Sequence, residues 1–148
     1  MRYEISDDPA RVDVDAAWAF LTTEAYWARW RTRNDFARQV ASAWRLVGCY
    51  AEDGAMVGFA RAFSDGVALA YLADVYVHPD HRGAGLGRRI VRAMVDDGPG
   101  RDFRWLLHTD DAHPLYAEFG FVPPDATLME RPHVTARPRP GSGPGAGG

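Results

Sequence analysis

The stretch VHPDHRGAGLGRR, residues 77–89, constrains the fold of this 148-residue chain more than any other segment. It follows an apolar run, and it places three alternating glycines, Gly83, Gly85 and Gly87, at the start of an amphipathic pattern. Glycine lets a backbone turn sharply and approach a ligand closely, and arginine binds anions. The stretch therefore predicts a junction at which a strand ends, a glycine-rich loop follows and a helix begins.

The apolar pattern around this junction predicts a mixed sheet. Three apolar segments separated by short turns precede the loop, which is typical of an antiparallel meander, and the helix and strand that follow predict a parallel neighbour. The expected strands are residues 3–6, 45–52, 55–64, 67–77 and 103–109, and the expected helices are 14–27, 34–44, 86–95 and 110–119. We expect an α/β (α+β) fold in which helices flank a mixed, mostly antiparallel central sheet.

Two helices carry the clearest signals. Asn34 or Asp35 is the expected N-cap of the second helix. The helix after the glycine-rich loop has an apolar face opposite an arginine-rich face. The apolar face consists of Leu86, Ile90, Val91, Met94 and Val95.

Composition excludes several classes of protein. The 17 basic residues are all arginine and the formal net charge is −3, so no global attraction to nucleic acid or to anionic membranes is expected. No apolar run approaches the roughly 20 residues that span a bilayer. The single cysteine, Cys49, excludes an internal disulfide framework. With no signal peptide at the N-terminus, we expect a cytoplasmic protein with one domain over residues 1–134 and a disordered Pro/Gly-rich tail over 135–148.

The glycine-rich loop has two interpretations. A helix N-terminus exposes unpaired backbone N–H groups and a positive dipole, so the loop suits a pyrophosphate. The alternative is a flexible turn without a ligand. The spacing G-x-G-x-G is neither a Rossmann fingerprint nor a P-loop, which needs a lysine that this chain lacks.

Two motifs give the chain a resemblance to a known family. RGAGLG, residues 82–87, resembles the acetyl-CoA motif Q/R-x-x-G-x-G/A of the GCN5-related N-acetyltransferases (GNAT), and AHPLYAEFGF, residues 112–121, resembles their A-x-x-L-Y-x-x-x-G-F segment. The resemblance covers roughly residues 45–131. It implies a splayed pair of parallel strands that forms an acetyl-CoA cleft. It also implies transfer of the acetyl group to a primary amine of a small molecule, by direct attack in a ternary complex.

The resemblance also implies cofactor contacts. A bulged fourth strand would hold the acetyl carbonyl and the pantetheine arm with its backbone, and the loop amides, helped by two arginines, would hold the pyrophosphate. Thr109 stands where relatives often carry an asparagine that contacts the cofactor. The expected contacts are Val75, Tyr76, Val77, Arg82, Gly83, Ala84, Gly85, Leu86, Gly87, Arg88 and Thr109.

Tyr116 stands where the family carries a tyrosine close to the thioester sulfur, so the resemblance implies a general acid for the departing thiolate. The general base is less clear, because Ala73 occupies the position of a glutamate found in some relatives. Asp74 is one candidate, with a structural acceptor role as its alternative. His108, at the end of its strand, and His113, in the first turn of the last helix, are two further candidates, because a neutral imidazole could take a proton from an ammonium acceptor. An ordinary structural histidine is the alternative for each.

The segment between the first two helices mixes aromatic residues with arginines, and family members use this region to wall the acceptor pocket. Aromatic rings offer flat apolar walls and arginines bind carboxylates, so we expect an acceptor amine that also carries an anionic group. Solvated arginines beside core tryptophans are the alternative. The expected acceptor-side residues are Tyr26, Trp27, Trp30, Arg31, Arg33 and His108.

Several questions stay open from the sequence. A noncatalytic acyl-CoA-binding sensor or subunit would keep the same loop without a base, and a nucleotide-binding module is a third reading. No trio of His, Cys, Asp or Glu has metal-ligand spacing, so we expect no metal. The acceptor, the acyl-chain length and the oligomeric state, a homodimer included, are not determined.

Overall fold

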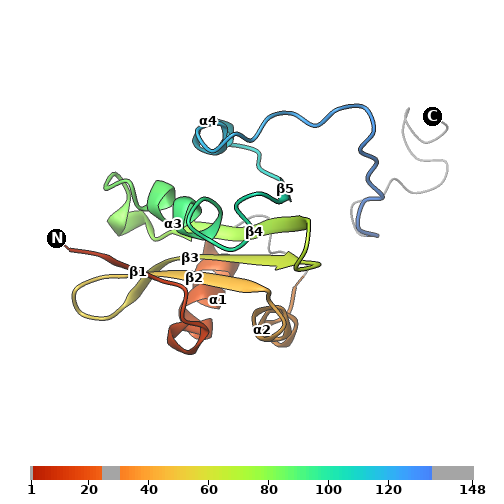
Figure 1. Cartoon of the computed structure of the whole chain (residues 1–148). Coiled ribbons are helices and arrows are strands. Elements are labelled where there is room, and N and C mark those ends of the chain that lie inside the picture. The colour runs from red at the N-terminus through yellow and green to blue at the C-terminus, as the bar shows by residue number, and fades with distance from the viewer. Residues whose placement is uncertain (1, 25–30, 135–148) are drawn as a thin grey trace.

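The computed structural model describes residues 2–24 and 31–134, and it contains one five-stranded sheet in the order β1-β2-β3-β4-β5 (Figure 1). The first four strands form an antiparallel meander, whereas β4 and β5 are parallel. The strands are β1 (Glu4–Ser6), β2 (Arg45–Tyr50), β3 (Met56–Ser64), β4 (Leu69–Val77) and β5 (Arg104–Leu106). The mixed, mostly antiparallel sheet expected from the sequence is confirmed.

Helices cover both faces of the sheet, with α1 and α2 on one face and α3 and α4 on the other (Figure 1). Each face buries its own apolar cluster, one built around Phe36 and Phe59 and the other around Ile90 and Met94. The helices are α1 (Val14–Thr23), α2 (Arg33–Ala41), α3 (Leu86–Met94) and α4 (His113–Ala117), and short 3-10 turns cover Pro9–Arg11 (η1) and Pro79–His81 (η3).

The apolar face predicted for α3 is confirmed, since all five of its residues are buried. Burying one such side chain stabilises a fold by about 1.5–3 kcal/mol relative to leaving it in water. The helix begins at Leu86, directly after the glycine-rich loop. This packing fixes the start of α3 beside the end of β4.

A β-bulge interrupts β4. Phe59 pairs with Tyr76 and Arg61 pairs with Ala73, so Asp74 and Val75 together face the single residue between Phe59 and Arg61 on β3. Asp74 has a φ of 57°, the one positive φ at a non-glycine residue in the described part of the chain. The extra residue reverses the alternation of side chains along the strand.

The consequence of the bulge is visible in the packing. Before it, Leu72 packs in the α3-side cluster; after it, Val75 packs against that cluster while Tyr76 belongs to the opposite one. Tyr76 lies flat against Phe20 of α1, with ring centroids 4.1 Å apart. The bulge therefore exchanges the two faces for the residues that follow it, so that Val75 and not Tyr76 is turned toward α3.

The parallel pair is short. Only three residue pairs join β4 to β5, from Leu69 with Arg104 to Tyr71 with Leu106. The sequence prediction of a buried strand over 103–109 was too long, because the chain leaves the sheet after Leu106 and its strand residues are exposed or half-buried. The two strands are therefore unpaired beyond Tyr71, toward the glycine-rich loop.

Helix ends also differ from the sequence prediction. Thr32, and not Asn34 or Asp35, caps α2, because its Oγ1 accepts a hydrogen bond from the amide of Asp35 at 3.1 Å. The predicted helix over 110–119 is reduced to α4, whose preceding turn is held by the Ala112 amide, which donates to Thr109 Oγ1 at 3.0 Å. Among the helices that the structure describes, none has the length and apolar character needed to cross a membrane.

Candidate active site

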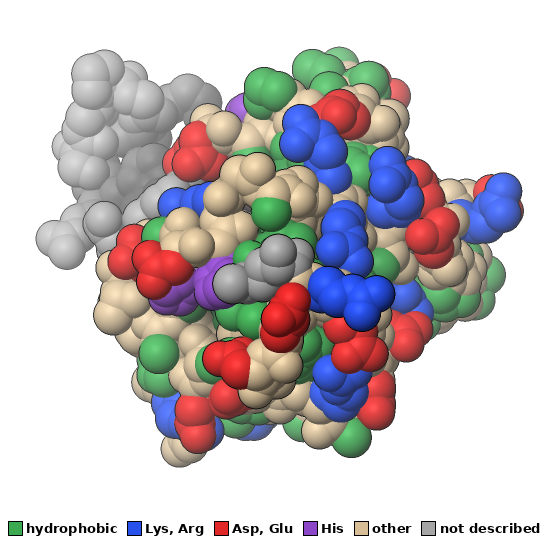
Figure 2. All heavy atoms as spheres, turned by 90° about the vertical axis from the view of Figure 1, so that its left-hand side faces the viewer, with side chains coloured by type: hydrophobic (Ala, Val, Ile, Leu, Met, Phe, Trp, Pro, Cys, Tyr) green, Lys and Arg blue, Asp and Glu red, His purple; other side chains and the backbone are tan. Residues whose placement is uncertain are grey.

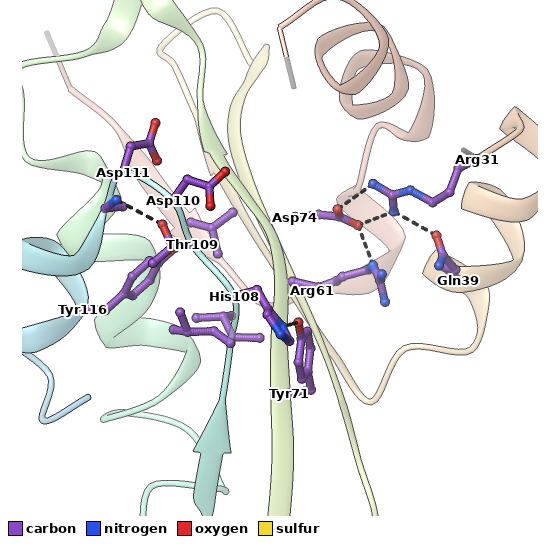
Figure 3. Close-up of a pocket in the computed structure, with 15 residues that line it drawn as sticks. Arg31, Gln39, Arg61, Tyr71, Asp74, His108, Thr109, Asp110, Asp111 and Tyr116 are labelled. Carbon is purple, nitrogen blue, oxygen red and sulfur yellow. Dashed lines mark hydrogen bonds and ion pairs between the residues drawn. The ribbon is translucent and has the colours of Figure 1, made fainter. Parts of the chain in front are cut away.

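A cavity of about 400 Å³ opens where β4 and β5 separate (Figure 3). Its walls come from the middle of β4, the segment that follows β5, the start of α4, and residues of β3 and of the α2 region. Tyr116 and Thr109 line one side, and Arg31 and Asp74 line the other (Figure 3). The cavity therefore connects the two faces of the sheet through the gap between the strands.

Asp74 is held by two arginines. Its Oδ1 accepts a hydrogen bond from Arg31 Nη2 at 2.7 Å, and its Oδ2 accepts from Arg31 Nη1 at 2.8 Å and from Arg61 Nε at 2.6 Å. Gln39 Oε1 accepts a further bond from Arg31 Nη1 at 2.9 Å. Asp74 and Arg61 are both buried, with residue exposures of 6% and 8%. Both carboxylate oxygens are thus engaged by guanidinium groups.

Burial alone raises the pKa of the Asp74 carboxyl. The hydrogen bonds and positive charges of Arg31 and Arg61 outweigh burial, so that the pKa lies below its ordinary value. A carboxylate with a lowered pKa and two bound guanidinium groups is a weak proton acceptor. The geometry therefore favours the structural acceptor role that the sequence left open for Asp74.

The cluster carries an excess positive charge, because two guanidinium groups share one carboxylate. Sequence reasoning missed Arg61, although one signal was available. Arg61 lies in the middle of the apolar strand MVGFARAFS, and a charged residue in a central strand needs a buried partner. Its Nε is bound to Asp74, while its guanidinium carbon lies 5.8 Å from the centre of the Phe63 ring.

Tyr116 lies on the opposite side of the cavity. It is 8% exposed, packs in the α3-side cluster, and meets the edge of Phe121 with ring centroids 5.9 Å apart. Burial, and to a lesser extent the negative charge of Asp111, raises the pKa of Tyr116 to about 12. The phenol consequently keeps its proton at neutral pH and has one available to donate.

A second hydrogen-bonded chain lines the cavity near the end of β5. Tyr71 Oη contacts His108 Nδ1, and His108 Nε2 lies 2.9 Å from Glu130 Oε2 (Figure 3 labels the first two). Tyr71 also stacks on Phe63, with ring centroids 4.9 Å apart. Sequence reasoning placed His108 at the acceptor but missed Tyr71 and Glu130, because Glu130 is 22 residues beyond His108 and no motif links them.

The glycine-rich loop joins β4 to α3 with exposed backbone. Gly83 and Gly85 have φ values of 89° and 75°, which favour glycine, and open space surrounds both positions. No side chain caps α3 at Gly85, and the Arg89 amide donates to the Gly85 carbonyl at 3.2 Å. The amides that precede Arg89 in the first turn have no acceptor within the helix. The loop thus has the open, donor-rich backbone that an anion requires.

Arginines next to the loop differ in their pairing. Arg82 Nε donates to the carbonyl of Val77 at 3.0 Å, which keeps the exposed Arg82 beside the end of β4. Arg88 Nε lies 3.0 Å from both carboxylate oxygens of Glu118 and bridges α3 to α4. Figure 2, which faces the side of the molecule that carries this loop, shows arginine and acidic side chains intermingled.

Other predicted site residues are dispersed. Val75 and Thr109 line the cavity, whereas His113 is exposed on α4 and is not among the described residues of the cavity wall. Arg33 faces α1, with its Nε 3.0 Å from Asp15 Oδ1. Tyr76 and Val77 follow the bulge, and Ala84, Leu86 and Gly87 belong to the loop and the first turn of α3. Tyr26, Trp27 and Trp30 lie outside the described residues.

Metal chemistry was not expected from the sequence. Within residues 2–24 and 31–134, no group of three or more His, Cys, Asp or Glu side chains is arranged to hold a metal ion. Cys49 is buried in β2, and burial raises the pKa of its thiol.

Comparison with known proteins identifies what the chain is similar to. The model of the acetyltransferase (GNAT) family matches residues 7–121. A protein of Gibberella zeae with an acetyltransferase assignment is 30% identical over 131 residues, which cover 75% of this chain and 74% of that protein. The L-amino acid N-acyltransferase MnaT of Escherichia coli is 41% identical over 51 residues, 31% of this chain and 29% of MnaT.

Solved structures show the same similarity. The crystal structure of a protein from Xanthomonas campestris pv. campestris, assigned to the acetyltransferases of the GNAT family, is 31% identical and has a TM-score of 0.81. The match covers 92% of this chain and 96% of that one.

Proposed function

This chain belongs to the GNAT acetyltransferase family, and we propose that it moves the acetyl group of acetyl-CoA directly to the primary amine of a small molecule. The observation that carries this proposal is the cavity between β4 and β5. It joins the face that holds Tyr116 to the face that holds Arg31, Asp74 and Arg61. A thioester and an amine can therefore approach each other from opposite faces of the sheet, and no covalent enzyme intermediate is needed.

The chain's own residues fit the coenzyme. The uncapped first turn of α3 and the loop amides over residues 83–88 would hold the pyrophosphate, with Arg82 beside them. The backbone of β4 over residues 75–77, left unpaired on the side of β5, would hold the pantetheine arm and direct an amide hydrogen at the acetyl oxygen. Acetyl-CoA supplies the activated acyl group. We assign Arg88 a smaller contribution to binding of the pyrophosphate than Arg82, because its guanidinium group is paired with Glu118.

Tyr116 is assigned the role of general acid. Its pKa of about 12 keeps the phenol protonated, and its place on the cavity wall allows it to donate that proton to the departing thiolate. Asp74 is assigned a positioning role, because it holds Arg31 and Arg61 at the acceptor side of the cavity.

We assign to the acceptor an anionic group in addition to its amine. On the Arg31 side of the cavity two guanidinium groups face one carboxylate, which favours a carboxylate or a phosphate there, whereas Asp110 and Asp111 line the Thr109 side. An amino acid has the required carboxylate, and the relative MnaT acts on L-amino acids, so amino acids are the first acceptors to test.

The test is the release of free thiol from acetyl-CoA with a panel of amines, in which each L-amino acid is compared with its carboxamide, which keeps the amine but lacks the carboxylate. We expect release of free thiol with at least one amine that carries a carboxylate. The kcat/KM for the corresponding amide should be at least tenfold lower. Initial-rate lines should intersect, as direct transfer in a ternary complex requires. Acetyl-CoA binding by calorimetry without thiol release from any amine would instead favour a noncatalytic acyl-CoA-binding protein.

A further inference from the structure

We propose that Tyr71, His108 and Glu130 form a proton relay that receives the proton of the acceptor's ammonium group. The relay rests on the proposed function, since a protonated amine cannot attack a thioester until it loses a proton. The three side chains form a continuous hydrogen-bonded chain: Tyr71 Oη meets His108 Nδ1, and His108 Nε2 meets Glu130 Oε2 at 2.9 Å.

The contacts determine the direction of each hydrogen bond. An ionised Glu130 carboxylate is an acceptor only, so His108 Nε2 must carry the hydrogen and donate it. Nδ1 of the neutral imidazole is then an acceptor, and the Tyr71 hydroxyl donates to it. The lone pairs of Tyr71 Oη that remain are free to accept a hydrogen bond from an amine.

The position of the relay agrees with that of an acceptor. Tyr71 and His108 line the same cavity as Arg31 and Arg61. Tyr71 lies on β4 before the bulge, and its ring is stacked on Phe63 of β3, the residue over which Arg61 also lies. The relay and the arginine pair are therefore available to one molecule, which the arginines hold by its anion.

The relay takes the place of a carboxylate base. Asp74, the acidic residue that the sequence analysis considered as the base, has both oxygens bound to guanidinium groups. His108 has no such competitor at Nδ1 except the Tyr71 hydroxyl, which is itself part of the relay.

One proton moves along the chain in each turnover. As the ammonium N–H bond breaks, its proton passes to Tyr71 Oη, and the phenol passes its own proton to His108 Nδ1. The amine is left neutral, the phenol is restored, and the imidazole becomes an imidazolium. The His108 side chain is 69% exposed, so the imidazolium returns its proton to water.

The surrounding charges suit this transfer. Glu130, with a side-chain exposure of 56%, faces the imidazole and accepts the hydrogen bond of His108 Nε2, which holds the ring in place. Burial, and then the negative charge of Glu130, raises the pKa of Tyr71, so the phenol passes a proton without becoming a phenolate. The other charged groups lining the cavity are Arg31, Arg61, Asp74, Asp110 and Asp111.

The test is the pH profile of kcat/KM for an amine that the thiol-release screen has identified. The variants are Tyr71→Phe, which keeps the ring on Phe63, His108→Gln and Glu130→Gln. Tyr50→Phe is the matched control, because the Tyr50 hydroxyl is buried without a partner in β2 and does not line the cavity. Thermal unfolding and calorimetric acetyl-CoA binding show that each variant is folded.

If the relay operates, we expect Tyr71→Phe and His108→Gln each to lower kcat/KM at pH 7 by about 100-fold. This deficit should shrink as the pH rises above the pKa of the amine, because the amine is then already neutral. Glu130→Gln should lower kcat/KM by less than the other two variants, since a glutamine side-chain oxygen can still accept the hydrogen bond from His108 Nε2.

Two results would overturn the relay and leave the proposed function intact. One is a His108→Gln variant with wild-type kcat/KM at pH 7, and the other is a loss of kcat/KM in the variants that is the same at every pH. If the wild-type protein binds acetyl-CoA but acetylates no amine, the proposed function fails and the relay fails with it. The two failures are distinguishable, because failure of the proposed function is seen in the wild-type protein, whereas failure of the relay alone is seen only in the variants.

Discussion

Arg31 and Asp74 are 43 residues apart in the sequence, yet their side chains form a two-point ion pair with N–O distances of 2.7 and 2.8 Å. Arg31 precedes α2, whereas Asp74 stands at the bulge of β4. The pair therefore fastens the α2 region to the strand that borders the cavity. Because Asp74 is 6% exposed, this link is protected from solvent and the first prediction concerns stability.

Asp74→Asn is expected to lower the free energy of unfolding by about 3–5 kcal/mol, because it leaves two guanidinium groups in a buried site without a counter-charge. Urea denaturation at pH 7 measures this change. Asp15→Asn is the matched control: Asp15 pairs with Arg33, but its side chain is 81% exposed, so its loss should hardly change the urea midpoint. Equal midpoints for the wild type and Asp74→Asn would contradict a structural role for the pair.

The same pair predicts a pH dependence. The pKa of Asp74 is lower in the folded protein than the value of about 3.9 for an unfolded chain. Its contribution to stability is therefore fully present above that value and is lost as the pH falls through the folded-state pKa. The difference in unfolding free energy between the wild type and Asp74→Asn should be constant from pH 7 to 5 and should shrink below pH 4. A difference that grows on acidification would contradict the lowered pKa.

Tyr116→Phe is expected to lower kcat by about 100-fold or more, because it removes the proton that the departing thiolate requires. The dissociation constant of acetyl-CoA, measured by calorimetry, should change less than threefold, since the ring that packs against Phe121 is retained. Unchanged turnover in Tyr116→Phe would remove the tyrosine from the mechanism.

Two glycines of the cofactor loop should respond differently to alanine. Gly85 has a φ of 75°, so Gly85→Ala should cost about 1–2 kcal/mol of stability through backbone strain. Gly87 lies inside α3, and an added Cβ would meet Leu115 Cδ2 at an ordinary 3.6 Å, so Gly87→Ala should leave the melting temperature unchanged or higher.

Comparing acetyl-CoA affinity with thermal stability in the two glycine variants shows whether each glycine is needed for the fold or for the ligand. If the amides of this turn approach a pyrophosphate, Gly85→Ala should weaken acetyl-CoA binding at least tenfold, whereas Gly87→Ala should change it little, because the family motif accepts alanine at the position of Gly87. Wild-type affinity in Gly85→Ala would place the pyrophosphate elsewhere. Calorimetry with acetyl-CoA and a thermal melt of each variant make this comparison.

Local patterns and the family resemblance predicted the elements and several residues of the cavity wall, but not the contacts that those residues make. The apolar face of α3 and the glycine-rich loop are visible from spacing alone, because helix packing and positive φ values restrict the residue types at those positions. The bulge at Asp74 carries no such mark. It depends on the pairing of two strands, and an aspartate at a positive φ leaves no signal in one sequence.

The hydrogen bonds between side chains in the cavity could not be predicted from local sequence patterns either, because they also depend on how the strands pair. The bonds from Arg31 to Asp74 and from His108 to Tyr71 span 43 and 37 residues, and only the folded sheet brings them together. The early end of β5 was equally unpredictable, because the apolar run continues past Leu106 while the chain turns to line the cavity.

The location of the coenzyme is the central claim of this account, and a crystal structure of the complex with coenzyme A tests it most directly. We predict the diphosphate at the first turn of α3, within hydrogen-bond distance of the amides of residues 83–88, and the sulfur in the gap between β4 and β5 beside Tyr116. A diphosphate bound away from that turn, or a sulfur directed out of the gap, would contradict the account.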